Sequence, residues 1–222
     1  MIKKVELSAT DMAAIREGAD AYLNNKGANL YKEDTYYQSV EYYRLAAAMG
    51  EVHSVSNLGY CYLYGRDIEA NTSLAIGYFV IAANKGDVDA AYKLGDIYST
   101  DKWGVKDKEL SNYYYCMAAD KVLDDGWRRG YSIVWARHLQ DFPSLCYALA
   151  RETFVGGSLP TDIKLSYQFL KHAELGYKDS LENGFDLHKE SYDGVLKLLK
   201  NKKYDSVRKE IDDLFNEEDY DE

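Results

Sequence analysis

The stretch AAYKLGDIY at residues 90–98 places a glycine, Gly95, inside a pattern of apolar residues that otherwise predicts a helix. The same motif, Leu-Gly-x-x-Tyr, occurs in LGYCY at residues 58–62, and the two glycines are 36 residues apart. A glycine within a helix costs about 1 kcal/mol relative to alanine, so a motif that repeats it indicates a compensating gain in packing. The chain therefore carries an internal repeat, which sets its architecture.

A second motif recurs with the same period, and it consists of two aromatic residues, two intervening residues and two alanines. It occurs as YYRLAA, YFVIAA and YYCMAA, whose last residues are Ala47, Ala83 and Ala119. A more divergent copy, CYALARETFVGG followed by SYQFLKHAELG, contains the corresponding Ala173, 54 residues after Ala119. Each copy is predicted to be a pair of helices, and about half a repeat is inserted between the third copy and the fourth.

Capping residues support the predicted start of the second helix in each pair. Twelve positions before each registered alanine lies a residue whose side chain can accept hydrogen bonds from a helix N-terminus. Glycines near the other end suit the left-handed conformation that closes many helices. The predicted N-caps are Thr35, Asn71, Asp107 and Thr161, and the predicted closing glycines are Gly50, Gly86 and Gly176.

The repeated glycine is explained if the two helices of a pair approach each other closely. Small residues on both helices let the backbones pack at short distance, while neighbouring aromatic rings fill the remaining volume. The expected contacts join Gly59, Gly95 and Ala150 on the first helices to Ala83, Ala119 and Ala173 on the second helices, in that order.

The chain resembles the Sel1-like repeat, a relative of the tetratricopeptide repeat. The resemblance is carried by Leu-Gly-x-x-Tyr, by GVKD at residues 104–107 and by the aromatic pair with its alanines. The resemblance covers about residues 13–176, with about four additional residues in NNKGANLYKEDT of the first copy. It implies an all-α fold, a right-handed α/α superhelix (solenoid) of helix-turn-helix repeats. It also implies a noncatalytic adaptor or scaffold that binds a protein or peptide on the concave face lined by the first helices.

The range of the repeat predicts the domain boundaries. Residues 1–178 form a solenoid of about four helix pairs with an inserted helix near residues 126–139, residues 179–216 form a helical C-terminal cap, and residues 217–222 form an acidic tail. The cap is predicted from two amphipathic patterns, because a stack of repeats must cover the apolar face at its open end.

Side chains next to the packed positions of each first helix are predicted to point into the concave face. They are polar and of mixed charge, so ordinary solvated helix surface is an alternative for each of them. The predicted residues are Asn57, Tyr60, Tyr64, Lys93, Asp96 and Arg151, with Glu17 and Asp20 in the first copy.

The insertion GWRRGYSIVWARHL, residues 126–139, concentrates aromatic and basic residues in an otherwise acidic chain. Tryptophan, tyrosine and arginine dominate the hot spots of protein interfaces, because they combine large contact area with directional polar groups. The structural alternative is an extra helix whose Ile133, Val134 and Trp135 wedge between the third and fourth copies. The partner-binding candidates in the insertion are Trp127, Arg128, Arg129, Tyr131 and Trp135.

The chain of 222 residues has a formal net charge of −10 and a pI near 5.0. This charge disfavours nucleic acid and anionic membranes as partners, because binding to phosphates depends on many Lys and Arg contacts. It also raises an alternative, an immunity-type or inhibitory protein that neutralises a basic enzyme or toxin. A third possibility is an enzyme with a site in the concavity, although the chain has no nucleotide-binding or nucleophile motif.

Cysteine and histidine spacing argues against a metal centre. The three cysteines, Cys61, Cys116 and Cys146, form no CxxC motif, and their odd number excludes a complete disulfide framework. The four histidines form no HxxxH pair, so neither a metal nor a cofactor is expected, and His172 is expected to be packed or half-buried. Acidic residues interrupt the N-terminal segment where a signal peptide needs an apolar core, which predicts a cytoplasmic location.

Overall fold

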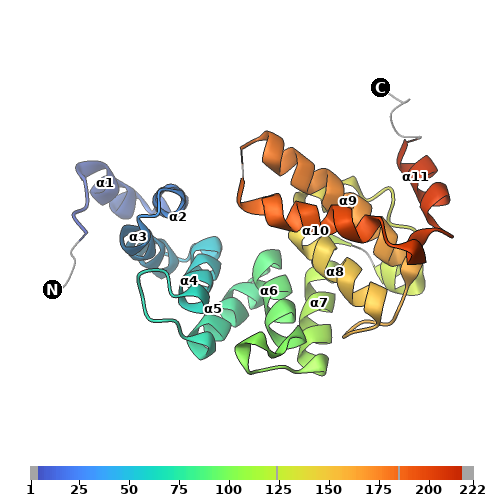
Figure 1. Ribbon diagram of the computed structural model, residues 1–222. Coiled ribbons are helices and arrows are strands. Elements are labelled where there is room, and N and C mark those ends of the chain that lie inside the picture. Colours follow the sequence, from blue (N-terminus) through green and yellow to red (C-terminus); the bar gives the residue numbers. More distant parts are fainter. Residues whose placement is uncertain (1–4, 124, 185, 217–222) are drawn as a thin grey trace. The chain divides into compact units, whose positions relative to one another are not determined.

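The computed structural model describes residues 5–123, 125–184 and 186–216 of the chain (Figure 1). Every regular element in these ranges is an α-helix or a short 3-10 turn, so the predicted all-α class is confirmed. The helices form two compact units, one up to Leu94 and one from Gly95 onward.

The first unit consists of helix pairs preceded by one further helix. Helices α2 and α3 pack together as one pair, and α4 and α5 pack together as the next. The elements are α1 (Ala9–Glu17), α2 (Asp20–Lys32), α3 (Tyr36–Ala48), α4 (Val52–Tyr64), α5 (Thr72–Asn84) and the first part of α6 (Val88–Ser99).

The second unit begins within α6 and contains the remaining helices. Helices α8 and α9 form a pair, and α10 packs along α9 (Figure 1). The α-helices are α7 (Lys108–Val122), α8 (Pro143–Val155), α9 (Ile163–Glu182), α10 (Lys189–Leu199) and α11 (Arg208–Asn216). The 3-10 turns are η1 (Asp101–Trp103), η2 (Asp125–Arg129), η3 (Arg137–Asp141), η4 (Asp186–His188) and η5 (Lys202–Tyr204). Below, α2, α4, α6 and α8 are the first helices, and α3, α5, α7 and α9 are the second helices.

Two of the four predicted N-caps make the expected hydrogen bonds. Asn71 Oδ1 accepts from the backbone N–H of Leu74 at 2.9 Å, and Asp107 Oδ1 accepts from two N–H groups of α7. Thr35 stands at the N-cap of α3, but its side chain makes no capping bond and its hydroxyl donates to a carbonyl instead. Thr161 was the wrong residue, because α9 begins one position later than predicted and Asp162, whose carboxylate is the stronger acceptor, is its N-cap.

The close approach at Gly95 is confirmed, but its partner is an aromatic ring rather than an alanine. A Cβ atom on Gly95 would lie 2.6 Å from Cδ1 of Tyr115, and one on Gly59 would lie 2.8 Å from Cε1 of Phe79. Each ring belongs to the residue one helical turn before the predicted alanine. The ring packs against the helix backbone at the glycine, where a Cβ atom would otherwise lie. The hydroxyl of Ser111 adds a hydrogen bond of 3.0 Å to the carbonyl of Gly95.

The same contact corrects the register of the first copy. A Cβ atom on Gly27 would lie 2.8 Å from Cε1 of Tyr43, so Gly27 is the counterpart of Gly59, 32 residues earlier. The turn between the two helices is four residues shorter in the first copy, because residues 33–35 join α2 to α3 while residues 65–71 join α4 to α5. Glu17 and Asp20 are therefore not the counterparts of the concave-face residues of α4.

Two of the predicted closing glycines have the expected backbone conformation. Gly50 and Gly86 have φ angles of 108° and 98°, which residues other than glycine rarely adopt. Gly176 does not end a helix, because α9 continues to Glu182 and carries Gly176 in its buried interior. A Cβ atom at Gly176 would meet the carbonyl oxygen of Gln140, so this glycine serves close packing instead.

The C-terminal helices pack on α9. Helix α9 runs through the predicted domain boundary at residue 178, and both α10 and α11 contact it. Tyr204 in η5 is fully buried, with its hydroxyl 2.7 Å from that of Ser166 and its ring 5.2 Å from the ring of Phe154. The predicted acidic tail, residues 217–222, lies outside the described residues. No helix within the described ranges is long and apolar enough to cross a membrane.

Candidate binding site

The insertion folds as two 3-10 turns, η2 and η3, and not as the predicted helix. Gly130 separates the turns with a φ angle of 80°, a left-handed conformation that stops a helix. Ile133 and Val134 beyond it are buried, as the structural alternative predicted. The same alternative placed Trp135 with them, but 57% of it is exposed, at a turn that the Ala136 N–H closes with a 3.0 Å hydrogen bond to the Ile133 carbonyl.

Two of the insertion's partner-binding candidates serve the fold. Trp127 is only 5% exposed, its indole N–H donates to Asp120 Oδ1 at 3.2 Å, and its ring packs edge-on against Phe169. The guanidinium of Arg128 pairs with the same Asp120 carboxylate and lies 5.4 Å from the centre of the Trp127 ring. These two side chains hold η2 against α7, and Trp127 also holds it against α9.

The remaining candidates of the insertion are exposed. Tyr131 is 66% exposed, and both it and the exposed Trp135 belong to the segment that links η2 to η3. Arg129 is exposed as well. The insertion therefore presents a small surface of aromatic and basic groups, defined here by Arg129, Tyr131 and Trp135 and called the insertion surface.

Four of the predicted concave-face residues lie together in the first unit. The Tyr60 ring meets Phe79 edge-on and stacks with Tyr64 at 6.4 Å, and the ammonium of Lys93 lies 5.5 Å from the centre of Tyr60. Burial raises the pKa of Tyr60 well above its usual value. The amide of Asn57 donates to the side chain of Asn24 on the preceding first helix at 3.1 Å.

The other two concave-face residues meet in the second unit. Arg151 on α8 pairs with Asp96 on α6, with Nη2 3.0 Å from Oδ1. The buried hydroxyl of Tyr115 donates to the same oxygen at 2.9 Å. Burial, together with the negative charge of Asp96, raises the pKa of Tyr115, so this hydroxyl stays protonated and keeps donating. The guanidinium of Arg151 also lies 5.1 Å from the centre of the Tyr147 ring.

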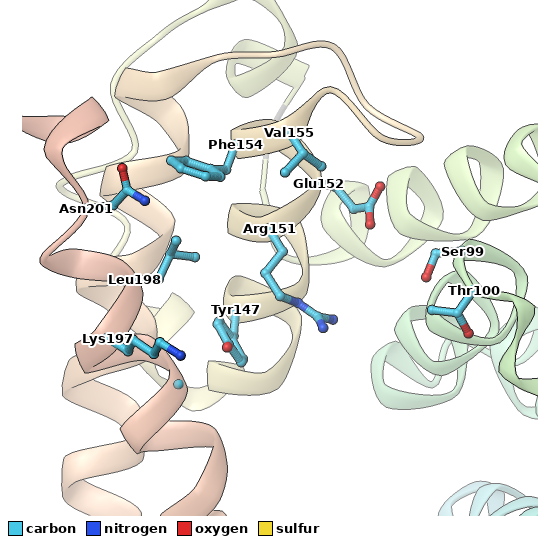
Figure 2. A pocket seen from close by; sticks show the side chains of 11 residues that line it. Ser99, Thr100, Tyr147, Arg151, Glu152, Phe154, Val155, Lys197, Leu198 and Asn201 are labelled. Carbon is cyan, nitrogen blue, oxygen red and sulfur yellow. The ribbon is translucent and has the colours of Figure 1, made fainter.

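A pocket of about 620 Å³ opens beside this ion pair, and it is called here the α8–α10 pocket. Figure 2 shows Tyr147 and Arg151 projecting from α8 and Lys197 projecting from α10 toward Tyr147. The end of α6 contributes a third side. The lining residues are Ser99, Thr100, Tyr147, Arg151, Glu152, Phe154, Val155, Gly194, Lys197, Leu198 and Asn201.

Sequence reasoning missed the α10 side of this pocket. It found Arg151 from the repeat, but it assigned α10 to a cap, and Lys197 is 50 residues from Tyr147 in the chain. One signal was available. Gly194 is a glycine inside a helix, and a Cβ atom there would meet the hydroxyl oxygen of Tyr147, which is the same kind of close approach that Gly95 makes.

The buried titratable groups outside the pocket are structural. His172 is fully buried, its Nε2–H donates to the carbonyl of Ile133 at 2.8 Å, and burial lowers its pKa to about 4. Cys61 and Cys146 are buried free thiols, and burial raises the pKa of Cys61 to about 12. Among the described residues, no group of three or more metal-ligating side chains is placed to hold an ion.

Comparison with known proteins accounts for the repeated contacts. The sequence profile of the Sel1 repeat matches residues 13–51, 52–87 and 88–122. This chain is a Sel1 repeat protein. Sel1 repeats are generally noncatalytic protein-interaction modules, so a binding role follows at this general level. The helix pair α8 and α9, which was predicted as a fourth copy, lies outside the three matched repeats.

Two solved structures with Sel1-type folds are similar to this Sel1 repeat protein. A Sel1 repeat protein from Oxalobacter formigenes has 20% sequence identity over 74% of this chain and 73% of that chain, with a TM-score of 0.50. The second is c5321, a protective antigen of uropathogenic Escherichia coli strains that displays an SLR fold. It has 18% identity and a TM-score of 0.44 over 81% of this chain, which spans 44% of that protein. No curated protein matches the sequence.

Proposed function

We propose that this chain is a noncatalytic protein-interaction module that binds a segment of its partner in the α8–α10 pocket. The observation that supports this assignment is the pocket itself, which places apolar and hydrogen-bonding side chains around one open volume of about 620 Å³. Pockets of this size and mixed lining are typical of ligand sites. Arg151, which lines it and pairs with Asp96, projects from a first helix, and the first helices are those from which the repeat predicted a binding face.

The chemistry of the pocket favours binding over catalysis. Among the described residues that line it, none is a histidine or a cysteine. Its carboxylate, Glu152, already accepts hydrogen bonds from the backbone N–H and the hydroxyl of Ser158, at 2.7 and 2.8 Å. A general base needs a free acceptor within reach of a substrate proton, and Oε2 of Glu152 is already used by Ser158.

Site-specific photocrosslinking in cells of the native source tests this proposal. A benzophenone side chain replaces Val155, which is 65% exposed at the pocket, and the matched control carries it at Tyr113, which is 55% exposed on α7. A partner crosslinked from position 155 and not from position 113 is the expected result. Equal crosslinking from both positions, or from position 113 alone, would contradict a binding role for the pocket.

The insertion surface is a second candidate, because Tyr131 and Trp135 are largely exposed although both are large aromatic residues. Exposed aromatic residues flanked by arginine are typical of interface hot spots. The double variant Tyr131→Ser, Trp135→Ser leaves the buried Trp127 and Val134 in place, so it tests binding without disturbing the fold. Loss of a captured partner in this variant, with crosslinking at position 155 unchanged, would assign recognition to the insertion surface.

The immunity-type alternative requires the acidic surface to meet a basic protein. The α8–α10 pocket does not favour it, because Arg151 and Lys197 supply positive charge there.

We also propose a cytoplasmic location, which the free thiols of Cys61, Cys116 and Cys146 support, since unpaired thiols are usual in reducing compartments.

A further inference from the structure

The α8–α10 pocket contains hydrogen-bond donors that have no partner. The ammonium of Lys197 and the hydroxyl of Tyr147 make no hydrogen bond or ion pair with any described residue. Asn201 uses its side-chain oxygen to accept from the backbone of Lys203 at 3.0 Å, which leaves its amide N–H groups available. These donors come from α8 and from α10 with the turn that follows it.

Each acidic group beside the pocket has one oxygen that already accepts two hydrogen bonds. The Oδ1 atom of Asp96 accepts from both Arg151 and Tyr115, and Oε2 of Glu152 accepts twice from Ser158. Lys197, Tyr147 and Asn201 therefore offer the unpartnered donors that can meet an acceptor on a ligand, and one of them carries a full positive charge. This polarity is opposite to that of the whole chain, whose formal net charge is −10.

Apolar side chains share the pocket with these donors. Phe154, Val155 and Leu198 line it, and Figure 2 shows Phe154 further along α8 than Tyr147 and Arg151. The ammonium of Lys203 lies 4.7 Å from the centre of the Phe154 ring, which adds a second positive charge near the apolar part. The pocket therefore presents one region for an anion and one for an apolar group.

We propose that the occupant is an extended peptide segment of a partner protein that carries an Asp or Glu two residues away from a large apolar residue. The carboxylate accepts from Lys197 and the Tyr147 hydroxyl, and the apolar side chain packs against Phe154 and Leu198. Side chains two residues apart lie on the same side of an extended peptide, so a single segment can fill both regions. This inference rests on the proposed function, and it adds the chemical class of the ligand.

Selection from a displayed library of random peptides tests the inference on the full chain. Enriched peptides are synthesised with acetylated and amidated ends, so that only side-chain carboxylates carry negative charge. Their affinities are measured for the parent, for Lys197→Glu and for Lys200→Glu. Lys200, the C-cap of α10, is exposed and outside the pocket lining, so its variant makes the same change in net charge without touching the pocket.

We expect peptides that combine Asp or Glu with Leu, Ile or Phe, and a loss of about tenfold or more in affinity for Lys197→Glu, as for a charge-assisted hydrogen bond. The Lys200→Glu variant should change affinity much less. Competition between each peptide and photocrosslinking at position 155 tests separately whether the pocket is a peptide site and whether its ligand is an acidic and apolar peptide. Neutral or basic peptides that block crosslinking but ignore Lys197→Glu would overturn the ligand class and leave the pocket as a peptide site. If no selected peptide blocks the crosslinking of a partner at position 155, the ligand class is wrong, and the comparison of positions 155 and 113 alone decides the proposed function.

Discussion

Gly95 shows how a single residue sets the spacing of a helix pair. Its missing Cβ lets the ring of Tyr115 lie directly on the α6 backbone, and Gly59 does the same for Phe79. Glycine does not make such a contact at every helical position where it occurs. Gly77 in α5 is exposed, and a Cβ atom built there meets nothing within 4 Å.

These two glycines give opposite predictions for the same substitution. Gly95→Ala should lower the free energy of unfolding by about 1–3 kcal/mol, because the added carbon overlaps the Tyr115 ring in a packed core. Gly77→Ala should raise it by about 0.5–1 kcal/mol through better helix propensity alone. Urea unfolding of both variants beside the parent measures the difference. Equal shifts in both variants would show that the close approach has no energetic role.

Asp11 is the other residue on which packing depends. It is fully buried near the N-terminus and accepts hydrogen bonds from Lys26 at 2.7 Å, from the Tyr42 hydroxyl at 2.9 Å and from Ser8. Burial alone would raise its pKa, but the bonds from Lys26, Ser8 and Tyr42 outweigh burial and hold the pKa well below its usual range. The ionised carboxylate thus ties α1 to α2 and α3.

Replacing Asp11 by Asn should cost about 3 kcal/mol, because it leaves the Lys26 ammonium without its buried partner. The matched double variant, Asp11→Asn with Lys26→Met, removes both charges and should recover part of that loss. Chemical unfolding followed by circular dichroism gives both values. A double variant no more stable than Asp11→Asn would mean that the ion pair does not account for the loss.

At the scale of the element, α9 holds the insertion through two side chains one helical turn apart. Oε1 of Gln168 accepts from the backbone N–H of Ile133 at 2.7 Å, and Nε2 of His172 donates to the carbonyl of the same residue at 2.8 Å. Both backbone groups of Ile133 are therefore satisfied without secondary structure. This explains why a segment with buried Ile133 and Val134 can pack without being a helix.

This arrangement predicts a pH dependence of stability. Burial lowers the pKa of His172 from 6.5 to about 4, although its bond to Ile133 opposes that shift. The unfolded chain then binds a proton between these values that the folded chain does not, so stability is complete above about pH 6.5 and falls as the pH approaches 4. The loss should reach about 2 kcal/mol at pH 5.

Urea unfolding at pH 7.5 and pH 5 measures this loss, with His172→Gln as the control that cannot titrate. The parent should lose about 2 kcal/mol more than the variant between the two conditions. The nearby His138 lowers the pKa of His172 only as a minor contribution. An identical pH dependence in parent and variant would assign the effect to other groups.

At the scale of the whole molecule, the sequence predicts the structural features that recur in every repeat, and it does not predict contacts that occur only once. The helix pairs, the caps at Asn71 and Asp107 and the exceptional glycines follow from a fixed period, because each repeat solves the same local packing problem. The shorter turn of the first copy and the conformation of the insertion do not recur, so no second copy reveals them. The α10 side of the α8–α10 pocket depends on a contact between Gly194 and Tyr147, which the period does not describe.

Net charge and local charge act in opposite directions on the proposed ligand. A chain with a formal charge of −10 repels an acidic peptide at long range, whereas Lys197 attracts its carboxylate at contact. The Debye length falls from about 30 Å at 0.01 M salt to about 8 Å at 0.15 M, so added salt screens the long-range repulsion more than the short contact. The association rate constant of a selected acidic peptide should therefore rise by severalfold over this range in stopped-flow measurements. Lys200→Glu should steepen that rise because it increases the repulsion. A rate constant that falls with salt would instead mean that the peptide is steered by a larger basic surface than the pocket provides.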